Sequence, residues 1–247
     1  MNMQGLKANL KFHWMNLGYS MLVFWVIMSL VMMFSVLINA MTAVSIGLFV
    51  SVTREGTTQA VSVVAAGFIA IVIYMIVVSL ASQPENFSFL IGLGTSRRTF
   101  YAAQVVVLIL VAFANSLIHA LAFALESSIL PMFGLQQLDY LEVYGLNLNL
   151  ATLTLAQWMI LTTVSAALMV VAALFYRYKS RNAIIVFVTL ATAGVILPVT
   201  FGINIWGYFF RWLFANATVW ELSGKLLLVS AVFWIIGWLI IRRTEAR

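Results

Sequence analysis

Few residues in this 247-residue sequence have the side chains that acid–base, nucleophilic or metal chemistry requires. The chain contains no cysteine and two histidines, His13 and His119, which lie far apart and have no carboxylate at helical spacing. A metal site needs several ligands, and a proton relay needs buried titratable groups. The GxxxxGK pattern of a phosphate-binding loop is also missing from the sequence. We therefore expect neither an enzyme nor a bound metal or cofactor, and no ATP hydrolysis by this chain itself.

A few polar side chains lie inside otherwise apolar stretches, and these are the candidates for contact with a substrate. Asn115 precedes His119 by one helical turn on the same face, and Thr162 and Thr163 occur together further along the chain. Polar groups surrounded by lipid usually form hydrogen bonds between helices. Two interpretations of His119 stay open at this point, structural pairing with another helix and a place on a substrate path.

The elements that position these residues are expected to be membrane-spanning helices. Of the residues, 64% are hydrophobic and 8% are charged, with a mean hydropathy of +1.08. A soluble domain is usually roughly 25% charged, and a spanning helix needs about 20 mostly apolar residues. We expect an all-α, polytopic membrane protein with one domain over residues 1–247 and six spans. The predicted spans are Leu17–Ala40, Ala60–Ala81, Phe100–Leu125, Ala151–Tyr176, Ala183–Ile205 and Lys225–Ile241.

The basic residues predict how these spans are oriented. Lysine and arginine concentrate in the cytoplasmic segments of membrane proteins. With the N-terminus placed in the cytoplasm, all 13 of them except Arg54, Arg211 and Lys225 fall in cytoplasmic segments. Most of the acidic residues fall in the outer segments. The sequence therefore predicts a multi-pass protein of the plasma membrane with both termini in the cytoplasm.

The N-terminal segment, residues 1–15, is expected to be a basic helix at the membrane interface. Leu6 and Leu10 are four residues apart, as are Lys7 and Lys11, so each pair lies on one face of a helix. A basic, partly apolar helix suits the bilayer interface. An ordinary positively charged flank of the first span explains the same pattern, and the sequence leaves both interpretations open.

Three further segments are expected to lie outside the spans. Met41–Val52 is apolar but short, which is typical of an interfacial or re-entrant piece. Residues 126–150 are expected to form the longest extracellular loop, and the Leu130-Pro131 pair ends any continuation of the third span. Residues 206–222 are rich in aromatic side chains, which indicates an interfacial or re-entrant loop.

A short cytoplasmic helix over residues 83–94 is predicted between the second and third spans. Ser82 and Glu85 fit the capping-box pattern, and Pro84 is tolerated in a first helical turn. Gly94 is a good helix terminator. The helix is therefore expected to be distinct from the span that precedes it.

This short helix is expected to carry apolar side chains on two faces. Phe87, Leu90 and Ile91 share one face, and Phe89 and Leu93 lie on roughly the opposite one. A helix that lies on a membrane needs only one apolar face. The second face therefore requires a partner, either another protein or the ends of neighbouring helices.

Arg97 and Arg98 follow in the first turn of the third span. The helix dipole disfavours cations at this position by roughly 0.3–1 kcal/mol. Thr95 or Ser96 could cap the turn. The arginines are explained either by orientation and lipid phosphates or by acidic groups on a cytoplasmic partner.

The stretch IGLGTSRRTFY, together with the arrangement of the helices, resembles a known family. A similar G-x-S-R-R-x-F sequence follows the first coupling helix in permease subunits of ABC-2-type (type V) transporters. The interfacial N-terminal helix, the six spans and the aromatic fifth loop are also similar to that family. The resemblance covers the whole chain as architecture, but the motif itself is short.

The resemblance implies a permease that works with other subunits. Two permeases, identical or homologous, would form the translocation path, and each would dock a separate cytoplasmic ATPase that binds the ATP. Membrane lipids would surround the chain, and no nucleic acid would bind. The residues that the resemblance assigns to ATPase coupling are Pro84, Glu85, Phe87, Phe89, Leu90, Leu93, Gly94, Arg97 and Arg98.

The substrate is expected to be lipophilic or amphipathic, because the spans contain few polar groups, and the direction is expected to be export. An alternative is a sensor or immunity subunit that binds an antimicrobial compound and signals or protects without transport. A membrane enzyme or scaffold without an ATPase is a third reading, and the scarcity of reactive side chains disfavours an enzyme.

Overall fold

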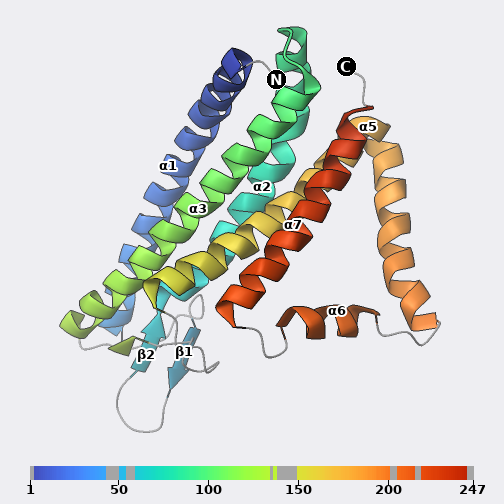
Figure 1. Cartoon of the computed structure of the whole chain (residues 1–247). Helices are drawn as coiled ribbons and strands as arrows, with labels where there is room; N and C mark the ends of the chain where they lie inside the picture. The colour runs from blue at the N-terminus through green and yellow to red at the C-terminus, as the bar shows by residue number, and fades with distance from the viewer. Residues whose placement is uncertain are drawn as a thin grey trace. The chain divides into compact units, whose positions relative to one another are not determined.

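The computed structural model consists mainly of long helices (Figure 1). It describes residues 3–42, 50–53, 59–133, 136–137, 149–200, 205–214 and 218–243. In chain order the helices and strands are α1 (Met3–Thr42), β1 (Val50–Thr53), β2 (Gln59–Ser62), α2 (Val63–Gly92), α3 (Arg97–Ile129), the 3-10 helix η1 (Leu130–Phe133), β3 (Gln136–Gln137), α5 (Leu150–Thr200), α6 (Ile205–Phe214) and α7 (Val219–Ile241).

Within the described residues, five helical segments are long and apolar enough to cross a membrane. The chain is therefore a multi-pass membrane protein, as its composition predicts. These five correspond to the expected first, second, third, fourth and sixth spans. The segments are Lys7–Phe34, Gly67–Gly92, Arg97–Met132, Leu150–Tyr178 and Val219–Ile241. The expected fifth span, Ala183–Ile205, lies mostly in the second part of α5 and is not one of the five.

Helix α5 joins two stretches that the sequence analysis separates by a cytoplasmic segment. It is one continuous helix of 51 residues, so the predicted break between Tyr176 and Ala183 is wrong. The intervening residues contain no glycine or proline, and lysine and arginine are good helix formers. A straight helix of this length would measure roughly 75 Å, more than twice the hydrocarbon thickness of a bilayer. In Figure 1 the ribbon of α5 changes direction between its yellow and its orange part.

The chain divides into two compact units. The first unit contains Met1–Trp14, Ile76–Ile109 and Met159–Arg247, and the second contains Met15–Met75 and Leu110–Trp158. Helices α1, α2, α3 and α5 each contribute residues to both units. Every contact described below lies within one of the two units.

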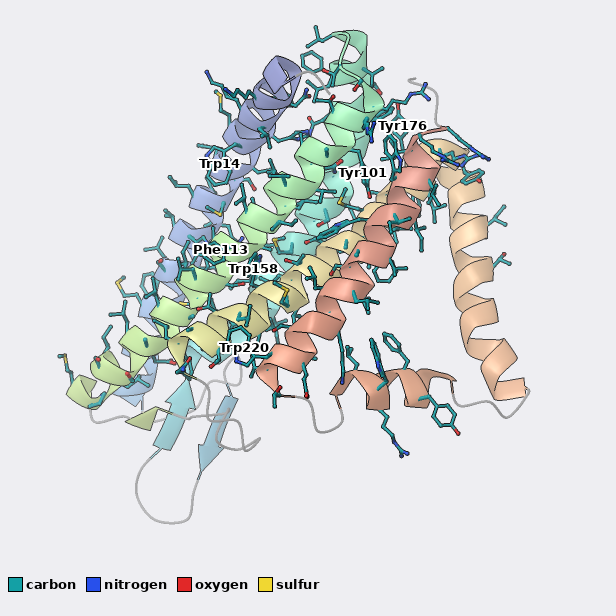
Figure 2. All side chains as sticks on the ribbon, viewed as in Figure 1. Trp14, Tyr101, Phe113, Trp158, Tyr176 and Trp220 are labelled. Atoms are coloured by element: carbon teal, nitrogen blue, oxygen red, sulfur yellow. The ribbon has the colours of Figure 1, made fainter. Side chains whose placement is uncertain are left out.

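The core of the first unit is aromatic. Phe87 of α2 contacts Phe100 of α3 and Tyr176 of α5 in T-shaped pairs with ring centroids 5.1 Å and 5.0 Å apart. The Tyr101 hydroxyl donates a hydrogen bond of 2.7 Å to the carbonyl of Trp234 in α7. Figure 2 labels Tyr101 and Tyr176 among the side chains. These contacts hold the ends of α2 and α3 against α5 and α7.

The second unit is held by α3, whose buried face includes polar as well as apolar residues. Phe113 of α3 packs edge-to-face on Trp158 of α5, with ring centroids 5.1 Å apart (Figure 2). Phe24 of α1 stacks on Tyr74 of α2 at 4.6 Å. Three helices besides α3 thus contribute rings to this unit.

A small sheet of three strands was not expected from the sequence. Strand β1 pairs antiparallel with β2, with Val50 opposite Ser62, and β2 pairs in parallel with β3. Valine and threonine favour extended backbone. The expected interfacial piece Met41–Val52 begins in α1 and ends in β1, while residues 43–49 lie outside the described part of the chain.

Several boundaries in the structure differ from those predicted from the sequence. The N-terminal helix of residues 1–15 and the first span form the single helix α1 from Met3 onward. Helix α3 extends to Ile129 before η1 begins, so the expected loop 126–150 starts later than predicted. The aromatic segment 206–222 contains α6 and the first turn of α7.

Candidate functional site

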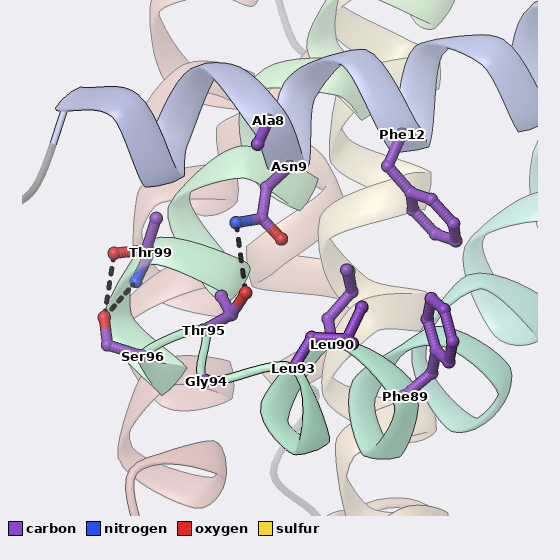
Figure 3. A pocket seen from close by; sticks show the side chains of 10 residues that line it. All are labelled: Ala8, Asn9, Phe12, Phe89, Leu90, Leu93, Gly94, Thr95, Ser96 and Thr99. Carbon is purple, nitrogen blue, oxygen red and sulfur yellow. Dashed lines mark hydrogen bonds between the residues drawn. The ribbon is translucent and has the colours of Figure 1, made fainter.

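The connection between α2 and α3 is the best-defined part of the predicted site (Figure 3). Gly94 has φ +84°, which favours glycine because it has no Cβ. Its N–H donates to the carbonyl of Ile91 at 2.9 Å, and the N–H of Thr95 donates to the carbonyl of Leu90 at 3.0 Å. This is the Schellman arrangement of a helix end. The predicted termination at Gly94 is confirmed.

Ser96 caps the N-terminus of α3. Its Oγ accepts a hydrogen bond of 3.2 Å from the N–H of Thr99, and its carbonyl accepts one of 3.0 Å from Phe100. Of the two residues that the sequence offered as caps, Ser96 is therefore the one used. Two consecutive local motifs fix the turn that carries the adjacent arginines.

The helix break predicted at Ser82 is not found. Helix α2 continues without interruption from Val63 to Gly92, and Pro84 lies inside it. Backbone groups in lipid must be satisfied within the segment, which favours continuing a helix through a weak local stop signal. The side chains of residues 82–85 lie outside the described part of the chain. The coupling roles of Pro84 and Glu85 therefore stay predictions.

The two apolar faces predicted for this segment are confirmed. Phe87 and Leu90 are buried, with 2% and 6% of their surface exposed. Phe89 and Leu93 are 54% and 68% exposed. One face therefore belongs to the core of the first unit, and the other remains accessible at the end of α2.

The N-terminal part of α1 partly covers the accessible face. The Phe12 ring stacks on Phe89, with centroids 5.8 Å apart and an interplanar angle of 29°. The Asn9 side chain, which is buried, donates from Nδ2 to Thr95 Oγ1 at 3.5 Å. The sequence analysis proposed an outside partner or neighbouring helices for this face, and α1 is one such neighbour.

An open groove of about 570 Å³ lies between α1 and this helix–turn–helix (Figure 3). Its lining consists of apolar residues from the two helices and hydroxyl-bearing residues from the turn. The lining residues are Ala8, Asn9, Phe12, Phe89, Leu90, Leu93, Gly94, Thr95, Ser96 and Thr99. The contribution of α1 to this groove was missed because nothing in one sequence pairs residues 8–12 with residues 89–99.

The two arginines have different environments. Arg97 Nη1 donates to the carbonyl of Arg242, just past the end of α7, at 3.0 Å. Arg98 is exposed. Arg97 therefore stabilises a helix C-terminus inside the first unit, which leaves Arg98 as the more accessible cation of the pair.

Asn115 is completely buried in the second unit and bonded to α1. Trp25 Nε1 donates to Asn115 Oδ1 at 2.8 Å, and Asn115 Nδ2 donates to the Val111 carbonyl at 2.9 Å. Both ends of the amide are thus paired with protein groups. Its partner Trp25 could not be identified from helical spacing, because the pair is 90 residues apart.

His119 is also completely buried and joins three helices. Its Nε2 lies 2.9 Å from the carbonyl of Val64 in α2, and its Nδ1 lies 3.1 Å from Gln157 Oε1 in α5. Because a carbonyl only accepts, Nε2 carries the proton, and Nδ1 then accepts a hydrogen bond from the side-chain amide of Gln157 with its NH2 group turned toward the ring. Glu126, expected in the outer loop, is instead buried in α3 and accepts from the Val64 N–H at 3.2 Å. These contacts support structural pairing for His119.

Thr162 and Thr163 belong to the first unit. Thr163 Oγ1 donates to the Met159 carbonyl at 2.8 Å and pairs with Ser230 Oγ of α7 at 2.9 Å. Thr162 Oγ1 is buried and has no hydrogen-bond partner among the described residues. Since Asn115 and His119 lie in the second unit, neither unit brings all the predicted path residues together.

Comparisons with known proteins do not assign the chain to a family, so any assignment depends on the helices and on the site described above. No protein-family model matches the chain, and no curated protein or solved structure matches it either. The class that the fold defines is a multi-pass, mainly helical membrane protein.

Proposed function

We propose that this chain is the permease subunit of an ABC exporter of the ABC-2 type, driven by a separate cytoplasmic ATPase. The observation that carries this proposal is the end of α2, where a well-capped turn presents exposed Phe89 and Leu93 beside exposed Arg98. Because α2 already buries one apolar face in the core of the first unit, its second apolar face is available to a partner protein. The sequence around this turn is also the part that resembles the ABC-2 permeases.

The proposed topology has six spans, with both termini in the cytoplasm of a plasma-membrane protein. The length of α5 and the change in its direction support two spans within this one helix. The basic residues between them, Arg177 to Arg181, would then lie on the cytoplasmic side with Arg97 and Arg98.

In this proposal the ATPase contacts Leu93, Gly94 and Arg98, while Phe87 and Leu90 transmit the motion. Phe87 is packed between Phe100 and Tyr176, so a push on the end of α2 acts directly on α3 and α5. A second permease, identical or homologous, completes the translocation path. The cargo is lipophilic or amphipathic, because the exposed helix surfaces are predominantly apolar.

One observation favours a second candidate, a sensor or immunity subunit that engages an ATPase but does not carry its ligand. Asn115 and both nitrogens of His119 are paired with protein groups and do not face an open path. Such a subunit needs the coupling surface but no polar path. Accumulation of a compound in inverted vesicles would distinguish transport from sensing.

The coupling surface is tested by affinity purification from native membranes with quantitative mass spectrometry. The wild-type chain is expected to retain one ABC ATPase, and the Leu93→Glu, Arg98→Glu double variant is expected to lose it while still inserting in the membrane. Met132→Glu, at another highly exposed apolar residue, is the matched control and should retain the ATPase. Recovery of no ATPase with the wild-type chain would overturn the proposal.

A further inference from the structure

The groove beside Phe12 has two chemically distinct ends (Figure 3). The stacked rings of Phe12 and Phe89 form an apolar wall at one end. The hydroxyl groups of Ser96 and Thr99 lie at the other end, 2.8 Å apart, in the first turn of α3. Because one of these hydroxyls donates to the other, the groove offers apolar contact and one free O–H donor to an elongated, amphipathic molecule.

Four basic residues are neighbours in the chain of residues that line this groove, although none of the four is itself part of the lining. Lys7 and Lys11 adjoin the lining residues Ala8 and Phe12 in the chain, and both lysine side chains are exposed. On α3, Arg97 adjoins Ser96, and the exposed Arg98 adjoins Thr99. An occupant with negative charge at the polar end is thus favoured. The N-terminal end of α3 contributes the positive end of its dipole in the same place.

The acidic residues whose side chains are described do not offset this charge. Glu126 belongs to the second unit. Glu221 lies in the first turn of α7. Arg97 instead bonds to the carbonyl of Arg242, at the other end of that helix. The two ends of α7 are roughly 30 Å apart at 1.5 Å per residue, about four Debye lengths at physiological salt. The carboxylate of Glu221 is therefore too far away to neutralise the basic side chains near the groove.

We propose that this groove is a binding site for one anionic phospholipid. In this proposal an acyl chain packs along Phe12, Phe89 and Leu90, and the phosphate lies at Ser96 and Thr99, where the exposed Arg98 is the neighbouring cation. Basic pockets between membrane helices bind anionic headgroups, and a groove on a membrane protein is exposed to lipid at high concentration. The site would anchor the N-terminal part of α1 to the α2–α3 turn.

A lipid is favoured over a peptide segment by the form of the groove. The apolar wall and the hydroxyl end are continuous, so one chain and one phosphate fill both. One side of the Phe89 ring stacks on Phe12 and forms the wall of the groove, while 54% of the Phe89 surface stays exposed. Leu93 and Arg98 also belong to the surface proposed for the ATPase. Leu93 is left out of the substitutions below, whereas Arg98 is replaced because it is the exposed cation next to the hydroxyl end of the groove.

The test is native mass spectrometry of the purified full chain, after exchange into mixed nanodiscs of phosphatidylglycerol and phosphatidylcholine. The wild-type protein is expected to retain one phosphatidylglycerol per chain and little phosphatidylcholine. Lys11→Gln combined with Arg98→Gln is expected to weaken phosphatidylglycerol retention by about fivefold for each cation removed. Arg243→Gln removes an exposed cation that does not adjoin the lining and should leave retention unchanged.

A second pair of variants tests the apolar wall. Phe12→Ala is expected to reduce retention of both lipids, whereas Trp14→Ala, at an exposed aromatic outside the lining, should not. If Phe12→Ala fails to fold, the Lys11→Gln, Arg98→Gln variant and its Arg243→Gln control alone decide whether the groove binds the anionic lipid. Free phosphate should not displace the lipid, because it cannot use the apolar wall.

Two results would overturn the proposal. One is equal retention of phosphatidylglycerol and phosphatidylcholine by the wild-type chain. The other is a combination of two findings: the Lys11→Gln, Arg98→Gln variant retains as much lipid as the wild-type chain, and the Phe12→Ala variant loses a co-purifying ATPase. That combination would assign the groove to the ATPase and not to a lipid. The proposed function survives the first result, because the ATPase capture experiment does not depend on lipid identity.

Discussion

Gly237 lies where α7 passes closest to the ring of Tyr101. A Cβ atom at this position would lie 2.5 Å from Tyr101 Oη, the atom that donates to the Trp234 carbonyl at 2.7 Å. Gly237→Ala must displace the ring and weaken that hydrogen bond. We expect it to lower the free energy of unfolding by about 1–3 kcal/mol, as measured by thermal unfolding in detergent.

Gly67 provides the matched control for this substitution. A Cβ atom there would lie 2.8 Å from the terminal methyl group of Met32, which belongs to a flexible side chain. Met32 can move aside, so Gly67→Ala should cost less than about 1 kcal/mol. Equal losses for the two substitutions would show that the contact with Tyr101 does not restrict Gly237.

At the scale of elements, the start of α2 is held by side chains of α3. The N–H of Val64 donates to Glu126, and its carbonyl accepts from His119, which also contacts Gln157 of α5. Replacing His119 with leucine leaves a buried carbonyl and a buried amide without that partner. We expect a loss of about 1–3 kcal/mol in the free energy of unfolding.

A double-mutant cycle with Gln157→Leu separates pairing from a transport role. The two losses should be non-additive by about 0.5 kcal/mol or more if the side chains stabilise each other. Ser127→Ala, at an exposed position on α3, is the control and should change stability by less than about 0.5 kcal/mol. Unchanged stability with lost transport would instead place His119 on the substrate path.

The sequence predicts these elements well where the signal is local. The termination at Gly94 and the two faces of the segment from Phe87 to Leu93 depend on neighbouring residues, and the structure confirms them. The sequence offered Thr95 or Ser96 as the cap, and the structure uses Ser96. The helix start at Ser82 was wrong, because an apolar helix continues through a weak stop signal when its backbone groups must be satisfied internally.

What the sequence could not supply is the pairing between distant segments. The partners of Asn115 and His119 lie up to 90 residues away, and helical periodicity gives no information about them. The same limit applies to Phe12 and Phe89, which form the groove wall from two helices. For the polar residues in apolar runs, the sequence left pairing between helices and a place on a substrate path both open, and it named no partner residue.

At the scale of the whole molecule, the number of spans decides between two topologies. In the part of the chain that the structure describes, five segments are long and apolar enough to cross, and six spans require the second part of α5 to cross as well. With the N-terminus inside, both topologies place Arg98 inside and Met132 outside. They differ after α5: six spans place Tyr208 outside and Arg243 inside, whereas five spans exchange the two.

Cysteine labelling in intact cells measures this difference directly, because the chain contains no cysteine of its own. Single substitutions to cysteine at Tyr208 and Arg243 place thiols at exposed positions, with Arg98→Cys and Met132→Cys as the inside and outside references. We expect a membrane-impermeant maleimide to label the cysteines at positions 132 and 208, and to label those at 98 and 243 only after permeabilisation. The reason is that a 51-residue helix that changes direction is long enough for two crossings. With six crossings in total, the basic C-terminal end lies in the cytoplasm, where lysine and arginine concentrate. Labelling of position 243 but not 208 in intact cells would contradict the six-span topology, because it would separate Arg242 from Arg97, whose guanidinium donates to the Arg242 carbonyl. The α2–α3 turn would stay inside in both topologies, so the proposed ATPase surface does not depend on this result.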